Sequence, residues 1–148
     1  VLHYLETLLQ DSGRQTTRVT QNGIDVLKVS LSGLGRSGGT AITEICCVPV
    51  AFNGSQRQLL QIFTTFAADL DADKLDAEAA AFNELNLTLT CGFVGIYRKL
   101  RQAYHKYTIL LSADENTAFR QATEALDMTL GAVNGIFDRA VIIADGNV

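Results

Sequence analysis

Apolar and polar residues alternate along the first part of the chain in the manner of β-strands. Residues 24–31 form such a run, and residues 14–21 before them are polar but rich in threonine and valine, which is consistent with a solvent-facing strand. Asn22-Gly23 between them is the strongest two-residue hairpin signal. Within residues 24–31, Leu27, Val29 and Leu31 point to one face. The pattern therefore predicts a hairpin with one apolar face.

Two further strand-like runs follow a glycine-rich loop at residues 33–39. Residues 40–50 alternate as a strand, and Asn53-Gly54 predicts a turn into residues 56–67. The apolar residues of this last run also satisfy helical spacing, so helix is the alternative. We interpret it as a strand because threonine and aromatic residues favour a pleated sheet and because the turn joins it to an established strand.

Helical spacing predicts three helices. The first covers residues 3–10, Asp71 can cap a second over residues 72–85, and Asp114 can cap the last. The last helix carries an apolar stripe that steps by three or four residues: Phe119, Thr123, Leu126, Leu130, Val133, Phe137 and Val141.

Residues 87–100 and 103–111 predict another pair of strands before the last helix. Gly92 and Gly95 weaken the first of these or mark a bulge. The predicted order of elements along the chain is therefore α-β-β-β-β-α-β-β-α. The strands come in hairpin pairs, which predicts an antiparallel sheet. We expect a single α+β domain over residues 1–148, in which helices pack on one face of a twisted antiparallel sheet.

The charge and the cysteines restrict the classes of partner and the compartment. A net charge of −4 argues against nucleic acid, and no apolar run reaches the ~18 residues that cross a bilayer. Three cysteines suit a reducing compartment, so we expect a cytoplasmic protein. Cys46 and Cys47 are adjacent in a strand and should face opposite ways, which disfavours a shared metal. We interpret the thiols as small buried groups, with a redox-reactive thiol as the alternative.

The segment Gly33-Leu34-Gly35-Arg36-Ser37-Gly38 matches the dinucleotide-binding pattern G-x-G-x-x-G. That mechanism requires a helix to begin directly after the glycines, so that its N-terminus faces a phosphate. Residues 40–45 alternate as a strand instead. The segment is therefore interpreted as a mobile hairpin loop, and no cofactor is predicted.

No constellation of residues points to catalysis or to a metal. Nucleophilic catalysis needs a base beside the nucleophile, and the chain has only His3 and His105. A pair between Cys91 and His105 is a minor alternative. Four acidic residues resemble the start of a calcium loop but lack its central glycine and terminal glutamate: Asp69, Asp71, Asp73 and Asp76. We therefore predict neither an enzyme nor a metal site.

The segment Phe82-Asn83-Glu84-Leu85-Asn86, followed by the strand Cys91-Gly92-Phe93-Val94-Gly95-Ile96, resembles the YbjN-like family. That family shares the type III secretion chaperone-like fold. The resemblance implies an α+β domain, often dimeric. For the secretion chaperones it implies binding of an unfolded protein segment, and for the YbjN-like branch a regulatory or stress-linked role. The family has no catalytic motif to carry over.

The sequence thus predicts a non-enzymatic protein-binding module, chaperone-like or regulatory, that forms a homodimer or binds a protein or peptide. The expected partner or dimer surface combines the last helix with a free sheet face: Leu126, Leu130, Val133, Phe137, Val94 and Ile96. The alternative is a small-molecule-binding protein or enzyme with a pocket between helix and sheet near Cys91, Tyr97 and His105.

Overall fold

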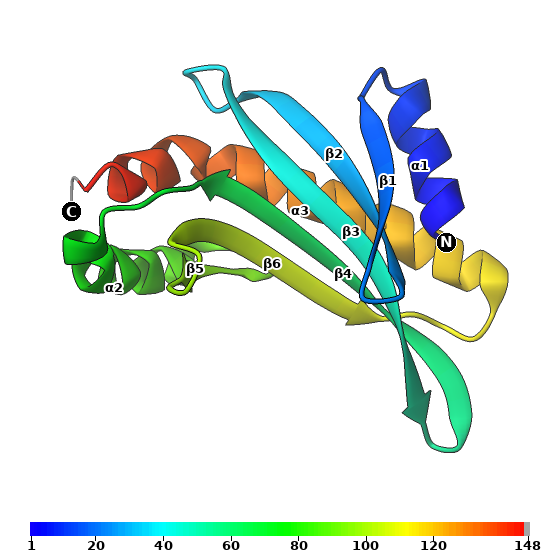
Figure 1. Cartoon of the computed structure of the whole chain (residues 1–148). Helices are drawn as coiled ribbons and strands as arrows, with labels where there is room; N and C mark the ends of the chain where they lie inside the picture. Colours follow the sequence, from blue (N-terminus) through cyan, green and yellow to red (C-terminus); the bar gives the residue numbers. More distant parts are fainter. Residues whose placement is uncertain (147–148) are drawn as a thin grey trace.

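One antiparallel sheet in the spatial order β1-β2-β3-β4-β6-β5 organises the molecule, and three helices lie along one of its faces (Figure 1). The structure is a computed structural model, and it describes residues 1–146. The strands are β1 (Thr16–Gln21), β2 (Ile24–Leu34), β3 (Gly39–Phe52), β4 (Ser55–Ala67), β5 (Phe93–Tyr97) and β6 (Gln102–Leu110). The helices are α1 (Leu2–Asp11), α2 (Leu75–Leu85) and α3 (Glu115–Ala144), with 3-10 turns at Ala72–Lys74 and Asn86–Thr88. The predicted α+β class and element order are confirmed.

Both Asn-Gly turns form the predicted hairpins. Asn22 and Gly23 have φ of 52° and 77°, and Asn53 and Gly54 have φ of 49° and 77°. Two consecutive residues in the left-handed region match the twist of the flanking strands, which asparagine and glycine tolerate best. The turns fix the register of β1 with β2 and of β3 with β4 without a bulge, and residues 56–67 lie in a strand as preferred.

The two predicted aspartate caps are present. The Asp114 carboxylate accepts a hydrogen bond of 2.9 Å from the Thr117 N–H at the start of α3. The Asp71 carboxylate accepts one of 3.1 Å from the Asp73 N–H. Asp71 heads the 3-10 turn Ala72–Lys74, so α2 itself begins only at Leu75.

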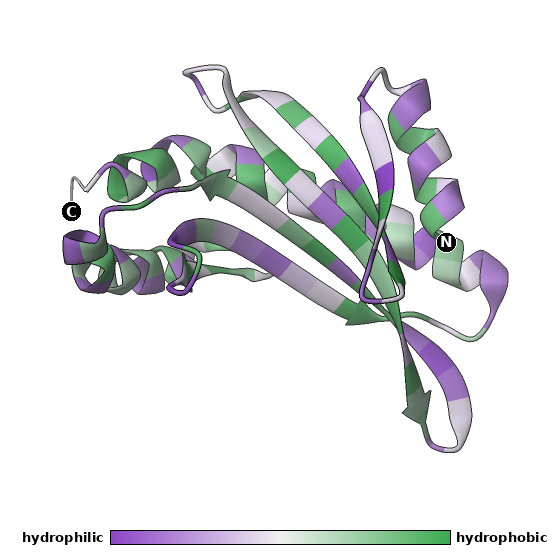
Figure 2. Ribbon diagram, in the orientation of Figure 1, coloured by the Kyte–Doolittle hydropathy of each residue, from purple (hydrophilic) through white to green (hydrophobic). Residues whose placement is uncertain are grey.

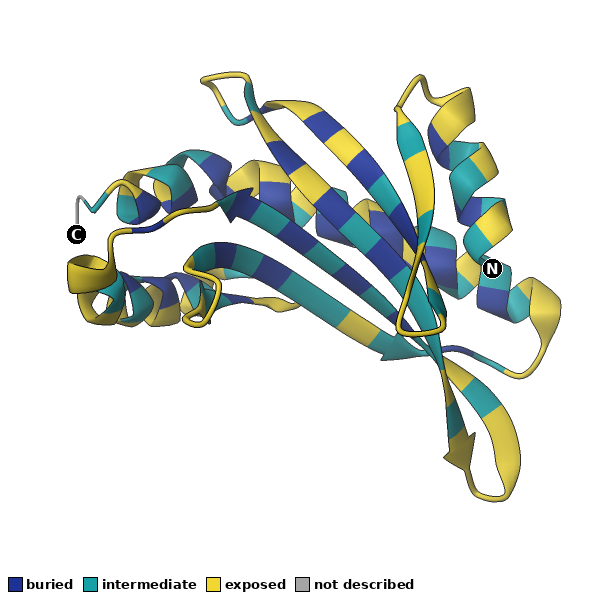
Figure 3. Ribbon diagram, viewed as in Figure 1, coloured by how far each residue is buried: buried dark blue, intermediate teal, exposed yellow. Residues whose placement is uncertain are grey.

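The core lies between the sheet and α3, where alternate strand residues meet the helix. Leu27, Ile45, Leu60 and Ile62 have no exposed surface, and the strands show this alternation in hydropathy and in burial (Figures 2 and 3). Half of the buried residues of α3 are alanines: Ala118, Ala122, Ala125, Leu126, Thr129, Val133, Ile136, Phe137, Ala140 and Ala144.

The apolar stripe predicted for α3 is therefore only partly correct. Leu126, Val133 and Phe137 are buried, whereas the Phe119 ring stacks on Tyr4 of α1, with 4.6 Å between ring centroids. The reason is that alanines let a helix approach a sheet closely, while spacing rules give more weight to bulky residues. No helix within residues 1–146 is both long and apolar enough to cross a membrane.

Strand β5 is shorter than the predicted run of residues 87–100. Gly92, at φ 67°, turns the chain into β5, and a Cβ there would lie 2.5 Å from the Lys106 carbonyl oxygen and 2.7 Å from the His105 ring. Only glycine fits this approach. Gly95 lies within β5, where the Tyr104 side chain crosses it, with the hydroxyl 3.3 Å from a Cβ at that position.

Two isoleucines of α3 test the assignment of its faces. Ile136 is 6% exposed and Ile142 is 52% exposed. We expect Ile136→Ala to lower the free energy of unfolding by about 2–5 kcal/mol because it leaves a cavity in the core. The matched control Ile142→Ala should change it by less than about 0.5 kcal/mol. Urea denaturation of both variants is the measurement, and equal effects would contradict the packing of α3.

Candidate functional site

The sheet face opposite the helices is formed by the alternate strand residues that the core does not use. We call this surface the open face. Its principal side chains are Val19, Val26, Lys28, Ser30, Ile42, Glu44, Cys46, Leu59, Gln61, Phe63, Thr65, Tyr104, Lys106 and Phe93. In the view of Figure 1, α3 runs behind the strands, so the open face is turned toward the viewer.

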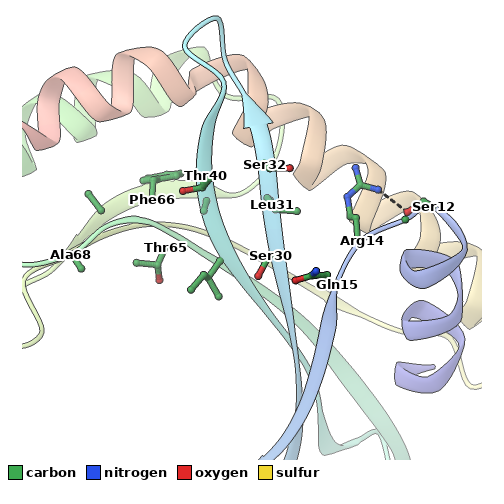
Figure 4. Close-up of a pocket in the computed structure, with 14 residues that line it drawn as sticks. Ser12, Arg14, Gln15, Ser30, Leu31, Ser32, Thr40, Thr65, Phe66 and Ala68 are labelled. Atoms are coloured by element: carbon green, nitrogen blue, oxygen red, sulfur yellow. Dashed lines mark hydrogen bonds between the residues drawn. The ribbon is translucent and has the colours of Figure 1, made fainter.

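A hollow of about 890 Å³ lies across one end of the open face. Ser30, Ile42 and Thr65 stand directly opposite one another in β2, β3 and β4 and line it together (Figure 4). Residues 12–15 border the hollow on one side and residues 67–68 on the other. Its lining consists of hydroxyl, amide and aliphatic groups and the aromatic residue Phe66, with a single charged side chain. That side chain is Arg14, whose guanidinium donates a hydrogen bond of 2.9 Å to the Ser12 hydroxyl.

An aromatic cluster adjoins the hollow. Tyr104 stands opposite Thr65 in the register of β6 and β4, so the cluster continues the same row of side chains. The Tyr104 ring stacks on Phe63, with 4.8 Å between centroids, and meets Phe93 edge-on at 5.8 Å. Phe93 is 46% exposed and Ile42 is 53% exposed. The open face therefore offers apolar surface beside hydrogen-bonding groups.

The pocket predicted near Cys91, Tyr97 and His105 has a different arrangement in the structure. His105 is fully buried on the helix side of β6, and its Nε2 donates a hydrogen bond of 3.0 Å to the Cys91 carbonyl oxygen. Tyr97 is 44% exposed and faces the open side because it alternates with Ile96. The three side chains are thus not brought together.

Neither His105 nor Cys91 is prepared for nucleophilic catalysis. Burial lowers the pKa of His105, and burial raises the pKa of the Cys91 thiol. The imidazole bonds to the backbone rather than to the thiol, and within residues 1–146 its Nδ1 has no hydrogen-bond partner. A base that activates a thiol must hydrogen-bond to the sulfur, so this geometry does not support the Cys91–His105 alternative.

The six residues expected to form a partner surface lie in the core instead. Val94, Leu126, Val133 and Phe137 are each at most 5% exposed. Leu130 and Ile96 are half-buried against the same core. The prediction was wrong for β5 because a strand has two possible phases, and packing under α2 selects Val94 and Ile96 for the helix side. It was wrong for α3 because the sheet covers the apolar stripe of the helix along its length. The sequence did contain a signal for the open face. Lys28 and Ser30 are polar positions of β2, and the residues that stand opposite them in β3 and then in β4 lie on the same face.

The adjacent cysteines face opposite ways, as predicted. Cys46 lies on the open face, where its Sγ donates to the Gln61 Oε1 at 3.8 Å, and Cys47 packs against the core. All three cysteines are free. Burial raises the pKa of both Cys46 and Cys47, which keeps them in the unreactive thiol form. Residues 1–146 contain no cluster of three or more ligands that would hold a metal.

The glycine-rich segment is a hairpin loop, as predicted, but α3 tethers it. The N–H groups of Gly35 and Arg36 donate to Asn134 Oδ1 at 2.9 Å and Asp138 Oδ2 at 2.8 Å. The Ser37 hydroxyl donates to the other Asp138 oxygen at 3.2 Å. The bonds to Asp138 lower the pKa of its carboxyl group, and the bond from the Arg36 N–H makes the largest contribution. The loop thus binds an anion, but the anion is a carboxylate of the same chain.

Comparison with known proteins adds no family assignment. No family model matches the sequence, and no curated protein matches it. The resemblance to the YbjN-like family stays a prediction from the sequence.

Removing the Asp138 carboxylate should release the glycine loop. In Asp138→Ala we expect the amide hydrogen of Arg36 to exchange faster with solvent, while Asp127→Ala, an exposed change on the same helix, should have no effect. Because the folded-state pKa is lowered, the tether contributes above the unfolded value of about 3.9 and is lost as the pH falls through the folded value. Hydrogen exchange followed by NMR is the measurement, and unchanged exchange in Asp138→Ala would refute the tether.

Glu78 of α2 should make stability depend on pH. It has no exposed surface, neither carboxyl oxygen has a hydrogen-bond partner within residues 1–146, and burial raises its pKa. The folded state therefore binds more protons than the unfolded state, and stability falls as the pH rises above about 4.3. We expect Glu78→Gln to be more stable than wild type at pH 7, and exposed Glu84→Gln to be unchanged. Equal stability of Glu78→Gln and wild type in denaturant titrations at pH 7 would contradict this.

Proposed function

We propose that the chain is a non-enzymatic protein-binding module that holds an extended polypeptide segment on the open face. The observation that carries this proposal is the position of the hollow beside the aromatic cluster, in one row that runs from Ser30 through Ile42 and Thr65 to Tyr104. A chaperone-like or regulatory role is part of the proposal. It is consistent with the role that the YbjN-like resemblance implies.

The chemistry of this row suits a polypeptide. The hydroxyls of Ser30, Ser32, Thr40 and Thr65 line the hollow and can both donate to and accept from peptide groups. The aromatic rings of Phe63 and Tyr104 provide rigid apolar area, which protein interfaces use as anchors. A cluster of like charges, which a phosphate or nucleic acid requires, does not line this hollow.

A small molecule is the second candidate for the same hollow. Its volume of about 890 Å³ falls within the range of about 300–1,000 Å³ of small-molecule pockets, and Arg14 provides one fixed charge. We favour the polypeptide because the apolar surface continues beyond the hollow onto Phe63, Tyr104 and Phe93, farther than a small ligand needs.

Selection from a random linear peptide library, displayed on phage, tests the proposal directly. We expect enriched peptides that shift the NMR signals of Ile42, Thr65 and Tyr104 when titrated into the chain. Ile42→Asp and Tyr104→Ala should each weaken binding by at least about tenfold, since each removes apolar contact from the row. Met128→Asp, on the solvent side of α3 and 45% exposed, is the matched control and should bind normally.

Two results would contradict the proposal. The first is a library selection that enriches no peptide. The second is a set of enriched peptides that bind Ile42→Asp as tightly as wild type, because such peptides would use another surface.

A further inference from the structure

The two outermost strands of the sheet, β1 and β5, each have one edge without a neighbouring strand, and β3 has such an edge where it extends past β2 (Figure 1). Unpaired N–H and C=O groups on such edges bind additional strands, and proteins commonly block them by specific means. These three edges differ in that respect.

A side chain closes the edge of β5. The Asn86 carboxamide donates to the Val94 carbonyl oxygen at 3.0 Å and accepts from the Val94 N–H at 2.7 Å. These two bonds are the ones that an added strand would make. On β3, the Asn53-Gly54 turn makes Val50 and Arg57 a hydrogen-bonded pair, and such pairs alternate with non-hydrogen-bonded ones. The next pair, Pro49 and Gln58, is therefore not hydrogen-bonded, and the Pro49 nitrogen faces away from β4. Proline has no N–H to offer there.

The backbone groups at the edge of β1 carry no such block, although α1 lies beside the strand, where Gln10 donates to the Thr16 hydroxyl at 3.0 Å and Glu6 contacts Arg18 at 3.5 Å. The Asn22-Gly23 turn makes Gln21 and Ile24 a hydrogen-bonded pair, so Thr16, Arg18 and Thr20 direct their N–H and C=O groups outward. Within the described residues, no other segment hydrogen-bonds these backbone groups. The strand, TTRVTQ, has no proline, lysine or acidic residue, and its register with β2 contains no bulge. It is rich in β-branched residues, which favour pairing.

We propose that β1 pairs antiparallel with β1 of a second copy of this chain, about a twofold axis at Val19. Outward-facing residues must pair with outward-facing residues, so the axis passes through residue 17, 18 or 19. An axis at Arg18 would set two guanidinium groups directly opposite each other, which is unfavourable. An axis at Val19 sets Val19 against its own copy and Arg18 against Thr20 of the second copy.

The charges select the axis at Val19 over the one at Thr17. Thr20 stands opposite Asp25 and donates its hydroxyl to the Asp25 carboxylate at 3.0 Å, so that carboxylate leans toward the edge. With the axis at Val19, Arg18 of the second copy lies on the same face, two strand spacings or about 9–10 Å from Asp25. An extended arginine side chain spans that distance, so in the dimer Arg18 would exchange its contact with Glu6 of its own α1 for Asp25 of the second copy. The twofold axis produces this ion pair twice.

The resulting dimer leaves the open face free. Directly opposite residues in neighbouring strands share a face, so the open faces of both copies become one surface across a twelve-stranded sheet. The inference is independent of the proposed function, because the β1 edge and the row from Ser30 to Tyr104 use different residues.

Disulfide trapping tests the axis. We expect Val19→Cys to form a covalent dimer under mild oxidation, above the background of wild type with its own three thiols. Thr17→Cys alone should not cross-link with itself, whereas a mixture of Thr17→Cys and Gln21→Cys should, because residue 17 faces residue 21 across the axis. Cross-linking of Thr17→Cys with itself, or none of Val19→Cys, would overturn the proposed axis.

Light scattering tests the edge itself. We expect a dimer mass for wild type and a monomer mass for Thr20→Pro. The N–H that proline removes faces outward, so its loss breaks no bond to β2. The control Thr20→Val retains this N–H and should stay dimeric. Asp25→Arg should weaken the dimer by at least about tenfold, and Arg18→Glu combined with Asp25→Arg should restore it. Both variants are made with Glu6→Gln, because Glu6 contacts position 18 and would repel the new glutamate. Three results would overturn the proposal: wild type is a monomer, Thr20→Pro is a dimer, or a monomeric chain binds a library peptide at the edge of β1. Peptide shifts at Ile42 and Thr65 in a monomer would leave the proposed function standing.

Discussion

The close packing of α3 against the sheet is the constraint on which the rest of the structure depends. Ala122, Val133 and Ala140 have no exposed surface, and their small side chains let the helix lie close along its 30 residues. Because strand residues alternate, committing one face to α3 determines which residues remain on the other. The open face, with its hollow and aromatic cluster, is therefore a direct consequence of how α3 packs.

Polar groups on the two sides of the sheet follow the same division. On the helix side, the hydroxyls of Thr43 and Thr64 hydrogen-bond to each other at 2.8 Å, which lets both be buried. On the open side, the polar groups of Ser30, Gln61 and Thr65 meet solvent or a partner. The edges divide in the same way: Asn86 closes β5, while β1 offers its backbone groups. The two proposals accordingly place interaction on one face and one edge.

Features encoded locally were predictable from the sequence, and features set by distant contacts were not. The Asn-Gly turns and the Asp114 cap depend on a few adjacent residues, so the two Asn-Gly hairpins, the start of the last helix and the element order were predicted correctly. The phase of β5 depends on α2 packing over the strand, which no local pattern specifies. The expected partner surface was therefore assigned to core residues. The tether of the glycine loop joins residues about 100 positions apart and left no local signal either.

The central claim is that one face of the sheet is buried by α3 and the other is open, and Leu59 and Leu60 report on it directly. These neighbours in β4 face opposite sides, and Leu60 has no exposed surface. The decisive measurement is the relaxation of their methyl signals by a soluble paramagnetic probe in NMR. The account predicts strong relaxation at Leu59 and little at Leu60. Equal protection of both would show that the second face is also covered and would contradict the account.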